Sequence, residues 1–433
     1  MFKSKLFTLL LALVFVFLLS MVSFGRIEVP RATAATGYQE LQLFTDVLTI
    51  VKRSYVEEVS VKDLVYGAIE GMLASLDPHS GFMSPEIYKE MKVDTRGEFG
   101  GLGIEISLRD GILTIISPIE DTPASRADLQ AGDHILKIED QYTKGMELMQ
   151  AVHLMRGVPG STITITIMRS SFEKPQPFTL EREVIKVKSV RSKTLGNGFG
   201  YVRLAQFQER SGEDLGNALD ELREVNGGSL QGLVLDLRNN PGGLLDQAVD
   251  VADKFLSEGL IVYTQGREDD AQMEFSAMRS GTEADYPMVI LINGGSASAS
   301  EIVAGALQDH GRAVIMGTQS FGKGSVQTII PLSDESGLRL TTAKYYTPNG
   351  SSIQARGIVP DIEVLPSEIK EAGGFNHFRE ADLKNHFDTE SNGENPAEED
   401  ASNLDEETRK DFQLMRALDL LKGWSIFQGL KAA

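Results

Sequence analysis

The chain has 433 residues, a length that predicts about three domains, and its 62 acidic against 42 basic residues give a net charge of −20. This charge argues against a nucleic-acid partner, because phosphate backbones are bound by clusters of lysine and arginine. The chain contains no cysteine, which excludes thiol nucleophiles, disulfides and thiolate metal sites. Its six histidines show no pair at metal-ligand spacing, so we expect neither a metal nor another cofactor.

The N-terminal segment has the pattern of an export signal. Lys3 and Lys5 precede an uncharged apolar run, Leu6–Phe24, that is just long enough to span a bilayer. A small-residue sequence at Ala32–Ala34 offers a cleavage site. Residues 1–34 are therefore predicted to be a signal peptide or a membrane anchor. The rest of the chain would then lie in the periplasm or another extracytoplasmic compartment, attached to the cell membrane if the anchor is retained.

Residues 38–95 have the periodicity of helices. The stretch "LQLFTDVLTIVKRSYV" places apolar residues at three- and four-residue spacing, and "SVKDLVYGAIEGMLASL" repeats the pattern behind a serine cap. Turn residues in "DPHSGFMSPE" interrupt the pattern before another short helix. We interpret this region as a small helical N-terminal cap, in which no catalytic chemistry is visible.

Residues 96–182 change to short β-strands separated by glycine turns. In "STITITIMRS", threonine and isoleucine alternate with the period of a half-buried strand. "GGLGIEI" resembles the carboxylate-binding loop of PDZ domains, and "AGDHILKIE" is similar to a strand of the same family. A glycine turn before an ordinary strand is the alternative, but two motifs in one context favour a PDZ domain. Their order, with the loop first, suggests the circularly permuted bacterial form.

A PDZ domain implies that this region binds peptides. The backbone N–H groups of Leu102, Gly103 and Ile104 would hold a terminal carboxylate, and the adjoining strand edge would pair with the peptide as an extra strand. The expected partners are therefore proteins or peptides with free C-terminal tails.

Residues 183–365 alternate strands and helices. The uniformly apolar runs "GLVLDL", "PMVILIN" and "AVIMG" predict buried parallel strands joined by right-handed crossovers. Parallel strands release their following loops at one edge of the sheet, where ligands bind. The loops "NNPGG", "GGSASAS" and "TQSFGKG" should therefore converge and bring Ser298 to Lys323.

The serine-rich loop offers several candidate nucleophiles. Ser296, Ser298 and Ser300 occupy every second position, and the residues alone do not choose between Ser298 and Ser296. Ser298 with Glu301 also fits a capping box, which would explain a serine there without catalysis. Lys323 alone would be read as a solvated surface lysine. Its place between glycines in a convergent loop, and the lack of histidine in these loops, favours a functional role.

Longer motifs in the same region resemble the carboxyl-terminal processing (tail-specific) proteases, which join a PDZ domain to a serine–lysine protease core. The motifs are "LRNNPGGLL", "GGSASASEIVAGALQD", "GTQSFGKGSVQ" and "KYYTPNGSSIQARGIVPDIEV", and the resemblance extends over about Tyr38 to Val364. It implies a multidomain α/β protein. The expected architecture is a crotonase-like α/β protease core with an inserted, circularly permuted PDZ β-domain and a helical N-terminal cap.

The resemblance also implies the roles of three side chains. By their positions in the motifs, Ser298 is the nucleophile, Lys323 the general base, and Gln327 the residue that orients the lysine. A lysine can act as a base only if burial lowers its pKa to about 7–8. The chain would then be an exported serine endopeptidase that recognises C-terminal tails and cleaves protein substrates through an acyl-enzyme.

The oxyanion of that reaction needs two hydrogen-bond donors. We expect the backbone N–H of Ala299 and that of Gly243, which we prefer to Gly242, to supply them. A helix N-terminus at Ser298 would add its positive dipole end. Asp309 is expected to have a structural role at a helix end.

Residues 366–433 lie beyond the resemblance. "DTESNGENPAEEDASNLDEE" is predicted to be an acidic linker. "TRKDFQLMRALDLLKGWSIFQGL" has the pattern of an amphipathic helix that would dock on the cap or on a second subunit. A homo-oligomer or an activating adaptor is compatible with the sequence. The alternative functions are a non-catalytic PDZ scaffold that binds tails, and a hydrolase of small acyl compounds.

Overall fold

A computed structural model describes residues 32–119, 121–267, 272–367 and 404–432 of the chain. The chain divides into one unit that ends at Asp77 and a second that begins at Pro78. The predicted export segment Leu6–Phe24 and most of the predicted acidic linker lie outside the described residues. No helix among the described residues has the length and apolarity that crossing a bilayer requires.

The first unit contains two helices, as the periodicity predicts. They are α2 (Ala32–Ser54), which starts earlier than the predicted Tyr38, and α3 (Val61–Ala74). The hydroxyl of Ser60 caps α3 by accepting a hydrogen bond from the backbone N–H of Asp63. The role of these helices as a cap stays a prediction.

The second unit begins with β1 (Gly81–Met83) and α4 (Pro85–Arg96), and then forms a small antiparallel β-domain. The isoleucines of β7 (Ile163, Ile165 and Ile167) are buried and its threonines face outward, which is the predicted period of two. The sheet has the order β3-β4-β5-β7-β8, with β6 paired to β5, and β2 pairs with β9 where the chain enters and leaves the domain. The elements are β2 (Glu98–Gly101), β3 (Ile104–Arg109), β4 (Ile112–Pro118), α5 (Pro123–Arg126), β5 (His134–Ile138), β6 (Gln141–Tyr142), α6 (Leu148–Met155), β7 (Thr162–Met168), β8 (Gln176–Glu181) and β9 (Glu183–Lys186).

The following α/β region is built on a sheet with the order β10-β11-β12-β15-β16-β19. All neighbours from β11 onward pair in parallel, as predicted, and β10 adds an antiparallel edge. Every residue of β12 and of β15 is buried, which is typical of parallel strands covered on both faces. The strands are β10 (Val190–Thr194), β11 (Phe199–Leu204), β12 (Gly232–Asp236), β15 (Met288–Ile292), β16 (Val314–Gly317) and β19 (Ile362–Glu363).

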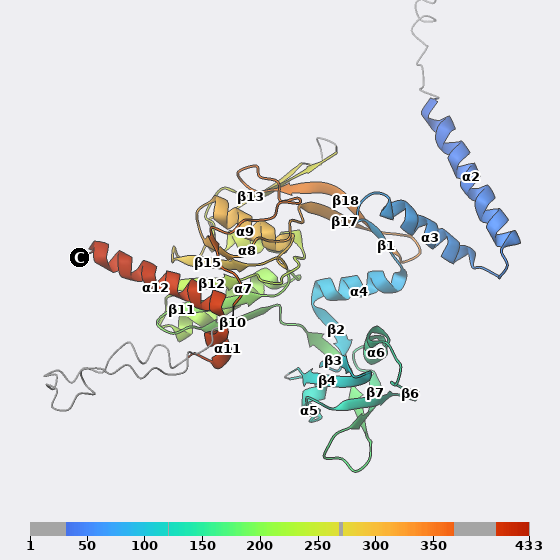
Figure 1. The fold of residues 1–433 in the computed structure, drawn as a ribbon, viewed down its shortest axis with the longest axis horizontal. Helices are drawn as coiled ribbons and strands as arrows, with labels where there is room; N and C mark the ends of the chain where they lie inside the picture. Colours follow the sequence, from blue (N-terminus) through green and yellow to red (C-terminus); the bar gives the residue numbers. More distant parts are fainter. Residues whose placement is uncertain (1–31, 120, 268–271, 368–403, 433) are drawn as a thin grey trace, which may run out of the picture. The chain divides into compact units, whose positions relative to one another are not determined.

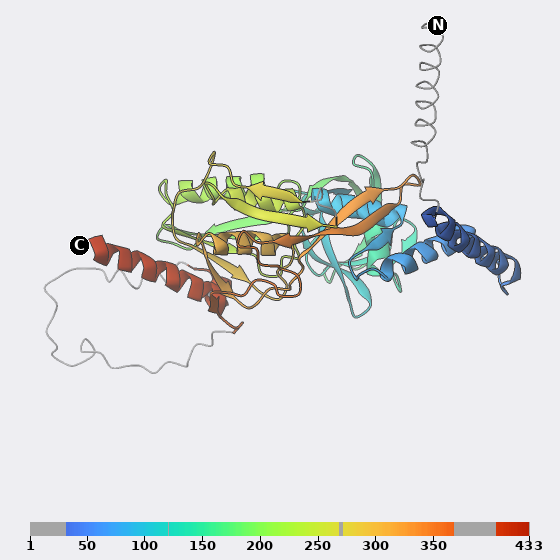
Figure 2. The same ribbon diagram turned by 90° about the horizontal axis from the view of Figure 1, so that it is seen from above.

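Two layers of helices cover this sheet (Figures 1 and 2). The helices α7 (Ser211–Val225), α8 (Leu245–Asp253) and α9 (Ala299–Asp309) bury one face, to which Leu233 and Leu235 belong. The opposite face, with Val234, is covered by α12 (Phe412–Ala432), which follows the short α11 (Glu406–Lys410). The first half of α12 therefore packs on the α/β core of its own chain, a surface that the sequence analysis did not name. Docking on the cap or on a second subunit stays a prediction.

A second, antiparallel sheet completes the core. Its order is β1-β18-β13-β14, with β17 paired to β18, so that the chain leaving β16 passes through the predicted Lys323 loop into β17. The remaining strands are β13 (Leu260–Gly266), β14 (Met273–Ser276), β17 (Ser325–Pro331) and β18 (Gly337–Tyr346). The mixed α/β content is as expected. The crotonase-like assignment and the circular permutation stay predictions.

Candidate active site

The three glycine-rich loops meet at the carboxyl edge of the parallel sheet, as predicted. The backbone N–H of Ala297 donates to the carbonyl of Asn240 at 2.9 Å, which joins the serine loop to the "NNPGG" loop. The N–H of Phe321 donates to the carbonyl of Ser296 at 3.0 Å, which joins the serine loop to the lysine loop. Residues far apart in the sequence thus form one continuous site.

A buried carboxylate holds two of these loops together. Glu301 has no exposed surface, and it accepts hydrogen bonds from the N–H of Ser298 at 2.7 Å and from the N–H of Lys323 at 2.9 Å. It also accepts from the hydroxyl of Ser320 and from the N–H of Gly322, each at 2.6 Å. The predicted capping box is present in both halves, since the Ser298 side chain also faces the backbone N–H of Glu301, and the remaining bonds of the carboxylate reach another loop. The capping-box interpretation missed this wider role.

The structure distinguishes the three serines by what their hydroxyls bind. Ser296 donates to the carbonyl of Leu237 at 2.8 Å and Ser300 donates to that of Asn240 at 3.0 Å, and both side chains are fully buried. Among the described residues, the Ser298 hydroxyl donates no hydrogen bond. Ser298 also has a φ of +57° at the N-terminus of α9. Such backbone strain in a residue other than glycine often marks a functional position.

Lys323 lies partly buried at the end of the third loop. Burial lowers the pKa of Lys323 below its ordinary value, the positive charge of Arg339 lowers this pKa further, and the carboxylate of Glu301 opposes both. A lower pKa increases the fraction of neutral amine near neutral pH, which is the form that can accept a proton.

Gln327 lies on β17 directly after the lysine loop. Its amide Nε2 donates to the carbonyl of Ser325 at 3.1 Å and to the Ser325 hydroxyl at 2.9 Å. The β17 pairing shifts register between Val326 and Gln327, so the simple four-residue spacing from Lys323 does not describe this segment. The expected contact of Gln327 with the lysine stays a prediction.

The two candidate oxyanion glycines differ in what their N–H groups bind. The N–H of Gly242 donates to the side chain of Asn240 at 2.9 Å. Within the described part of the chain, no hydrogen bond is made by the N–H of Gly243 or of Ala299. A β-carbon on Gly242 would lie 2.8 Å from Cβ of Ser298 and 3.0 Å from the nitrogen of Ala299, so this loop lies directly against the serine.

Asp309, at the end of α9, lies outside this constellation. Its carboxylate accepts a hydrogen bond from the backbone N–H of Asn349 at 2.9 Å. This contact fixes a turn beyond β18 and agrees with the expected structural role.

The predicted peptide-binding residues line a groove in the small β-domain. Leu102, Gly103 and Ile104 border a cavity of about 210 Å³ between β3 and α6, and apolar side chains such as Val152 complete it. Gly103 has a φ of +75°, and a β-carbon there would lie 2.3 Å from Thr122, so this turn requires glycine.

Comparisons with known proteins agree with these features. Residues 198–364 match the model of peptidase family S41, residues 100–181 match that of the PDZ domain, and residues 23–87 match that of the activating protease CtpB N-terminal domain. A carboxy-terminal-processing protease of Bartonella bacilliformis is 47% identical over 391 residues, 89% of this chain and 89% of that protein. A carboxyl-terminal-processing protease of Synechocystis is 39% identical over 72% of this chain and 74% of its own.

A solved structure of a photosystem II D1 C-terminal processing protease is 31% identical, covers 75% of this chain and 92% of its own, and has a TM-score of 0.44. The identity to the curated relatives extends over both the α/β core and the PDZ domain. This chain belongs to the carboxy-terminal processing protease family, whose PDZ domain accompanies an S41 peptidase, and it is a serine-type peptidase.

Proposed function

We propose that the chain is an exported endopeptidase that uses Ser298 as nucleophile and Lys323 as general base. The observation that carries this proposal is the Glu301 carboxylate, which binds the backbone N–H of both residues. A catalytic pair needs a fixed geometry, and a buried carboxylate with several charge-assisted hydrogen bonds supplies it. The Ser298 hydroxyl, whose hydrogen is donated to no acceptor among the described residues, and the lowered pKa of Lys323 support the proposed chemistry.

In the proposed reaction, neutral Lys323 takes the proton of the Ser298 hydroxyl as Oγ attacks the substrate carbonyl. The tetrahedral oxyanion accepts hydrogen bonds from the N–H groups of Gly243 and Ala299, which have no partner among the described residues. The Lys323 ammonium then protonates the leaving amine, and the C–N bond breaks to give the acyl-enzyme. Attack by water, with Lys323 again as the base, releases the acid product and restores Ser298.

We further propose that the PDZ groove selects substrates by their C-termini. A carboxylate would bind the N–H groups at Leu102, Gly103 and Ile104, while the last apolar side chain enters the groove beside Val152. Cleavage of an unfolded protein that ends in apolar residues should exceed that of the same protein with an amidated C-terminus. Equal rates for both substrates would exclude recognition through the carboxylate.

The basic and apolar N-terminal residues support export to the periplasm or another extracytoplasmic compartment. Cell fractionation and N-terminal sequencing of the mature protein test this proposal. The catalytic part is tested by incubating the purified protein with an unfolded reporter and identifying the fragments by mass spectrometry. Wild-type protein should produce internal cleavages that Ser298→Ala abolishes. Binding of the reporter without cleavage by wild-type protein would instead favour the scaffold.

A further inference from the structure

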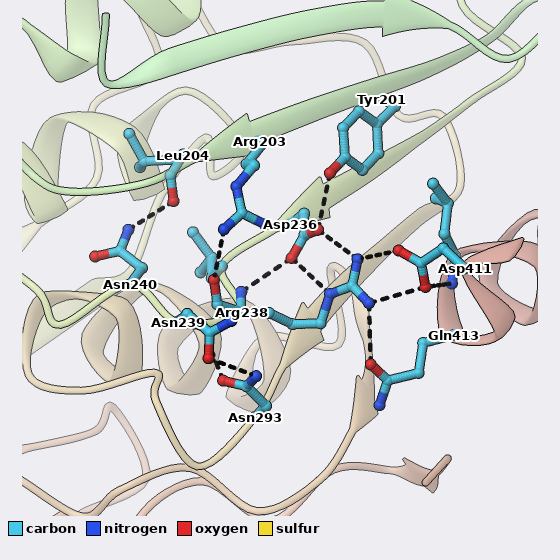
Figure 3. Close-up of polar contacts among 12 residues, drawn as sticks. Tyr201, Arg203, Leu204, Asp236, Arg238, Asn239, Asn240, Asn293, Asp411 and Gln413 are labelled. Atoms are coloured by element: carbon cyan, nitrogen blue, oxygen red, sulfur yellow. Dashed lines mark hydrogen bonds and ion pairs between the residues drawn. The ribbon is translucent and has the colours of Figure 1, made fainter. Parts of the chain in front are cut away.

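A single arginine joins the C-terminal segment to the strand that leads into the oxyanion loop. Arg238 follows β12, and its guanidinium lies between the carboxylates of Asp236 and Asp411 (Figure 3). Nη1 of Arg238 donates to Asp411 and to Gln413, each at 3.0 Å, and Nη2 donates to Asp411 at 2.6 Å. The acceptors lie at the start of α12, far along the chain from β12.

This ion pair is part of a buried network at the end of β12. Asp236 has no exposed surface, and its carboxylate accepts from the backbone N–H of Arg238 at 2.9 Å, from Nη2 of Arg238 at 2.6 Å and from the hydroxyl of Tyr201 at 2.8 Å. Burial works to lower the pKa of Arg238, but hydrogen bonds to Asp236 and Asp411 outweigh it and hold the pKa above its ordinary value. The guanidinium is therefore charged, and it is shared by two carboxylates.

The residues that follow Arg238 form the loop that reaches the active site, and their side chains are also held by hydrogen bonds. The side-chain Nδ2 of Asn293 donates to Oδ1 of Asn239 at 2.9 Å. The side-chain Oδ1 of Asn293 accepts from the backbone N–H of Asn239, also at 2.9 Å. Asn240 donates to the carbonyl of Leu204 at 2.8 Å. Gly243 lies three residues after Asn240 in the same loop. Phe207 holds the far end of this loop through hydrogen bonds with Gly242 and Leu244, and the contacts of Arg238, Asn239 and Asn240 hold its near end.

The docking of α12 also has an apolar interface, apart from this ion pair. Leu414, Leu418 and Leu421 are buried against the outer face of the sheet and supply an apolar interface. A buried ion pair is often no more stabilising than apolar side chains of similar volume, because removing charges from water is costly. We therefore look for the role of Arg238 and Asp411 in positioning the neighbouring loop.

We propose that Asp411 is a positioning residue for peptide hydrolysis: from the C-terminal segment it fixes Arg238, and through Arg238 the loop that presents the N–H of Gly243 to the oxyanion. Gln413 supports the same guanidinium. This inference rests on the proposed function, because it assumes that Gly243 is an oxyanion donor. It makes the C-terminal segment, which covers the sheet face opposite α9, a part of the catalytic geometry.

The test is the steady-state kinetics of Asp411→Asn on a peptide reporter. The substitution keeps the shape but removes the charge that binds Nη2, so the loop should lose its fixed position. Loss of a complete oxyanion donor costs about 10²–10³-fold in kcat, and partial displacement should cost about tenfold or more. KM should change little, because Asp411 touches no proposed substrate-binding residue. Asp411→Glu keeps the charge and should recover part of kcat.

Asp419→Asn is the matched control, because Asp419 lies on the same helix and, within the described part of the chain, forms its ion pair only with the exposed Arg416, at 3.5 Å. All variants are compared at equal folded fraction, measured by circular dichroism and Tm. A folded Asp411→Asn variant with the kcat of Asp419→Asn would overturn the inference. If Asp411→Asn does not fold, Gln413→Ala is the second variant: it removes two neutral hydrogen bonds, one with Arg238 and one to the carbonyl of Val364, and leaves the ion pair in place. At equal folded fraction it should still lower kcat at constant KM, whereas an unchanged kcat would reject the idea.

Ser298→Ala in the same assay separates this inference from the proposed function. If Ser298→Ala is inactive while Asp411→Asn keeps full kcat, the serine mechanism stands and the role of Asp411 fails. If Ser298→Ala cleaves as fast as wild type, the proposed function itself fails.

Discussion

The carboxylate of Glu301 accepts a hydrogen bond from the backbone N–H of Lys323 at 2.9 Å, although the two residues lie 22 positions apart. The same carboxylate accepts from the N–H of Ser298. Glu301 is the third residue of α9 and would be an ordinary helix-capping glutamate if the lysine loop were absent. Its position means that one side chain sets both the geometry of the proposed catalytic pair and the electrostatic environment of the lysine.

Glu301→Gln should therefore lower kcat strongly. The amide keeps the shape but turns an acceptor into a donor that faces backbone N–H groups. Loss of a charge-assisted hydrogen bond costs about 1.5–3 kcal/mol, which corresponds to about 10–10²-fold in rate. Asp361→Asn is the control, because Asp361 also accepts a backbone N–H, from Ile315 at 2.8 Å, but lies outside the three loops. Equal kcat values for both variants would contradict the role of Glu301.

The three serines should separate activity from stability. Ser298→Ala should abolish turnover and change Tm little. Ser296→Ala leaves the carbonyl of Leu237 and the N–H of Asn293 without the partner they have now. It should lower the free energy of unfolding by about 1–3 kcal/mol while the folded fraction keeps most of its kcat. Thermal unfolding and steady-state kinetics on the same samples measure both effects. A Ser298→Ala variant that stays active would contradict the assignment of Ser298 as the nucleophile.

The rate should rise with pH through a single pKa that lies below that of an ordinary lysine. As the proposed base, Lys323 would be protonated and inactive below its pKa and neutral and active above it. Arg339 lowers this pKa and Glu301 raises it. Arg339→Gln should therefore move the acidic limb of the pH–rate profile to higher pH, and Glu301→Gln should move it to lower pH. Shifts in the same direction would show that the limb does not report Lys323.

Lys323→Arg should be about as inactive as Lys323→Ala. Arginine keeps the positive charge but remains protonated at every pH of the assay, so it cannot accept the proton of Ser298. Gln327→Ala should be milder, because its amide binds Ser325 in this structure. Measurable turnover of Lys323→Arg with the wild-type pH profile would exclude Lys323 as the base.

Tail binding should depend on the PDZ groove and not on Ser298. Val152 lines the groove, so Val152→Asp should weaken binding of a peptide with an apolar free C-terminus by about tenfold or more, because a charge would lose its hydration there. Tyr142→Asp, at an exposed position on β6 outside the groove, should bind normally. Fluorescence anisotropy in the Ser298→Ala background measures both, and equal affinities would place the peptide elsewhere.

Leu418→Ala should destabilise the α/β core. Leu418 on α12 is buried to 1% exposure against the outer face of the sheet, and truncating such a leucine costs about 2–5 kcal/mol. The loss should not depend on protein concentration, because the contact lies within one chain. A Tm difference that disappears at low protein concentration would point to docking on a second subunit instead.

Local pattern in the sequence determined a large part of this picture. Uniformly apolar runs such as that of β15 predict buried parallel strands, and glycine-rich loops after them predict one shared edge. The sequence alone therefore predicts that Ser298 and Lys323 share one site, because strand periodicity and loop glycines are properties of neighbouring residues. The motifs that carry the family resemblance are local in the same sense.

The tertiary structure decided what depends on contacts between distant residues. The residues alone did not distinguish Ser298 from Ser296, because the difference is a hydrogen bond from Ser296 to Leu237, in another loop. The four groups that donate to the Glu301 carboxylate come from two loops, and the sequence pattern predicts only the capping contact.

The docking of α12 was also beyond the sequence pattern. An amphipathic helix shows that it has an apolar face but not which surface covers that face. The surface that buries the apolar face of α12 is the sheet at β12 and β15. The continuous apolar runs of these strands must be buried on both faces of the sheet. Only the folded chain shows that α12 covers the second face and that Asp411 meets Arg238 there. Hydrophobic burial is non-directional, so an apolar helix face does not specify its partner surface. A hydrogen bond needs two groups at a defined distance and angle, which only the tertiary structure gives.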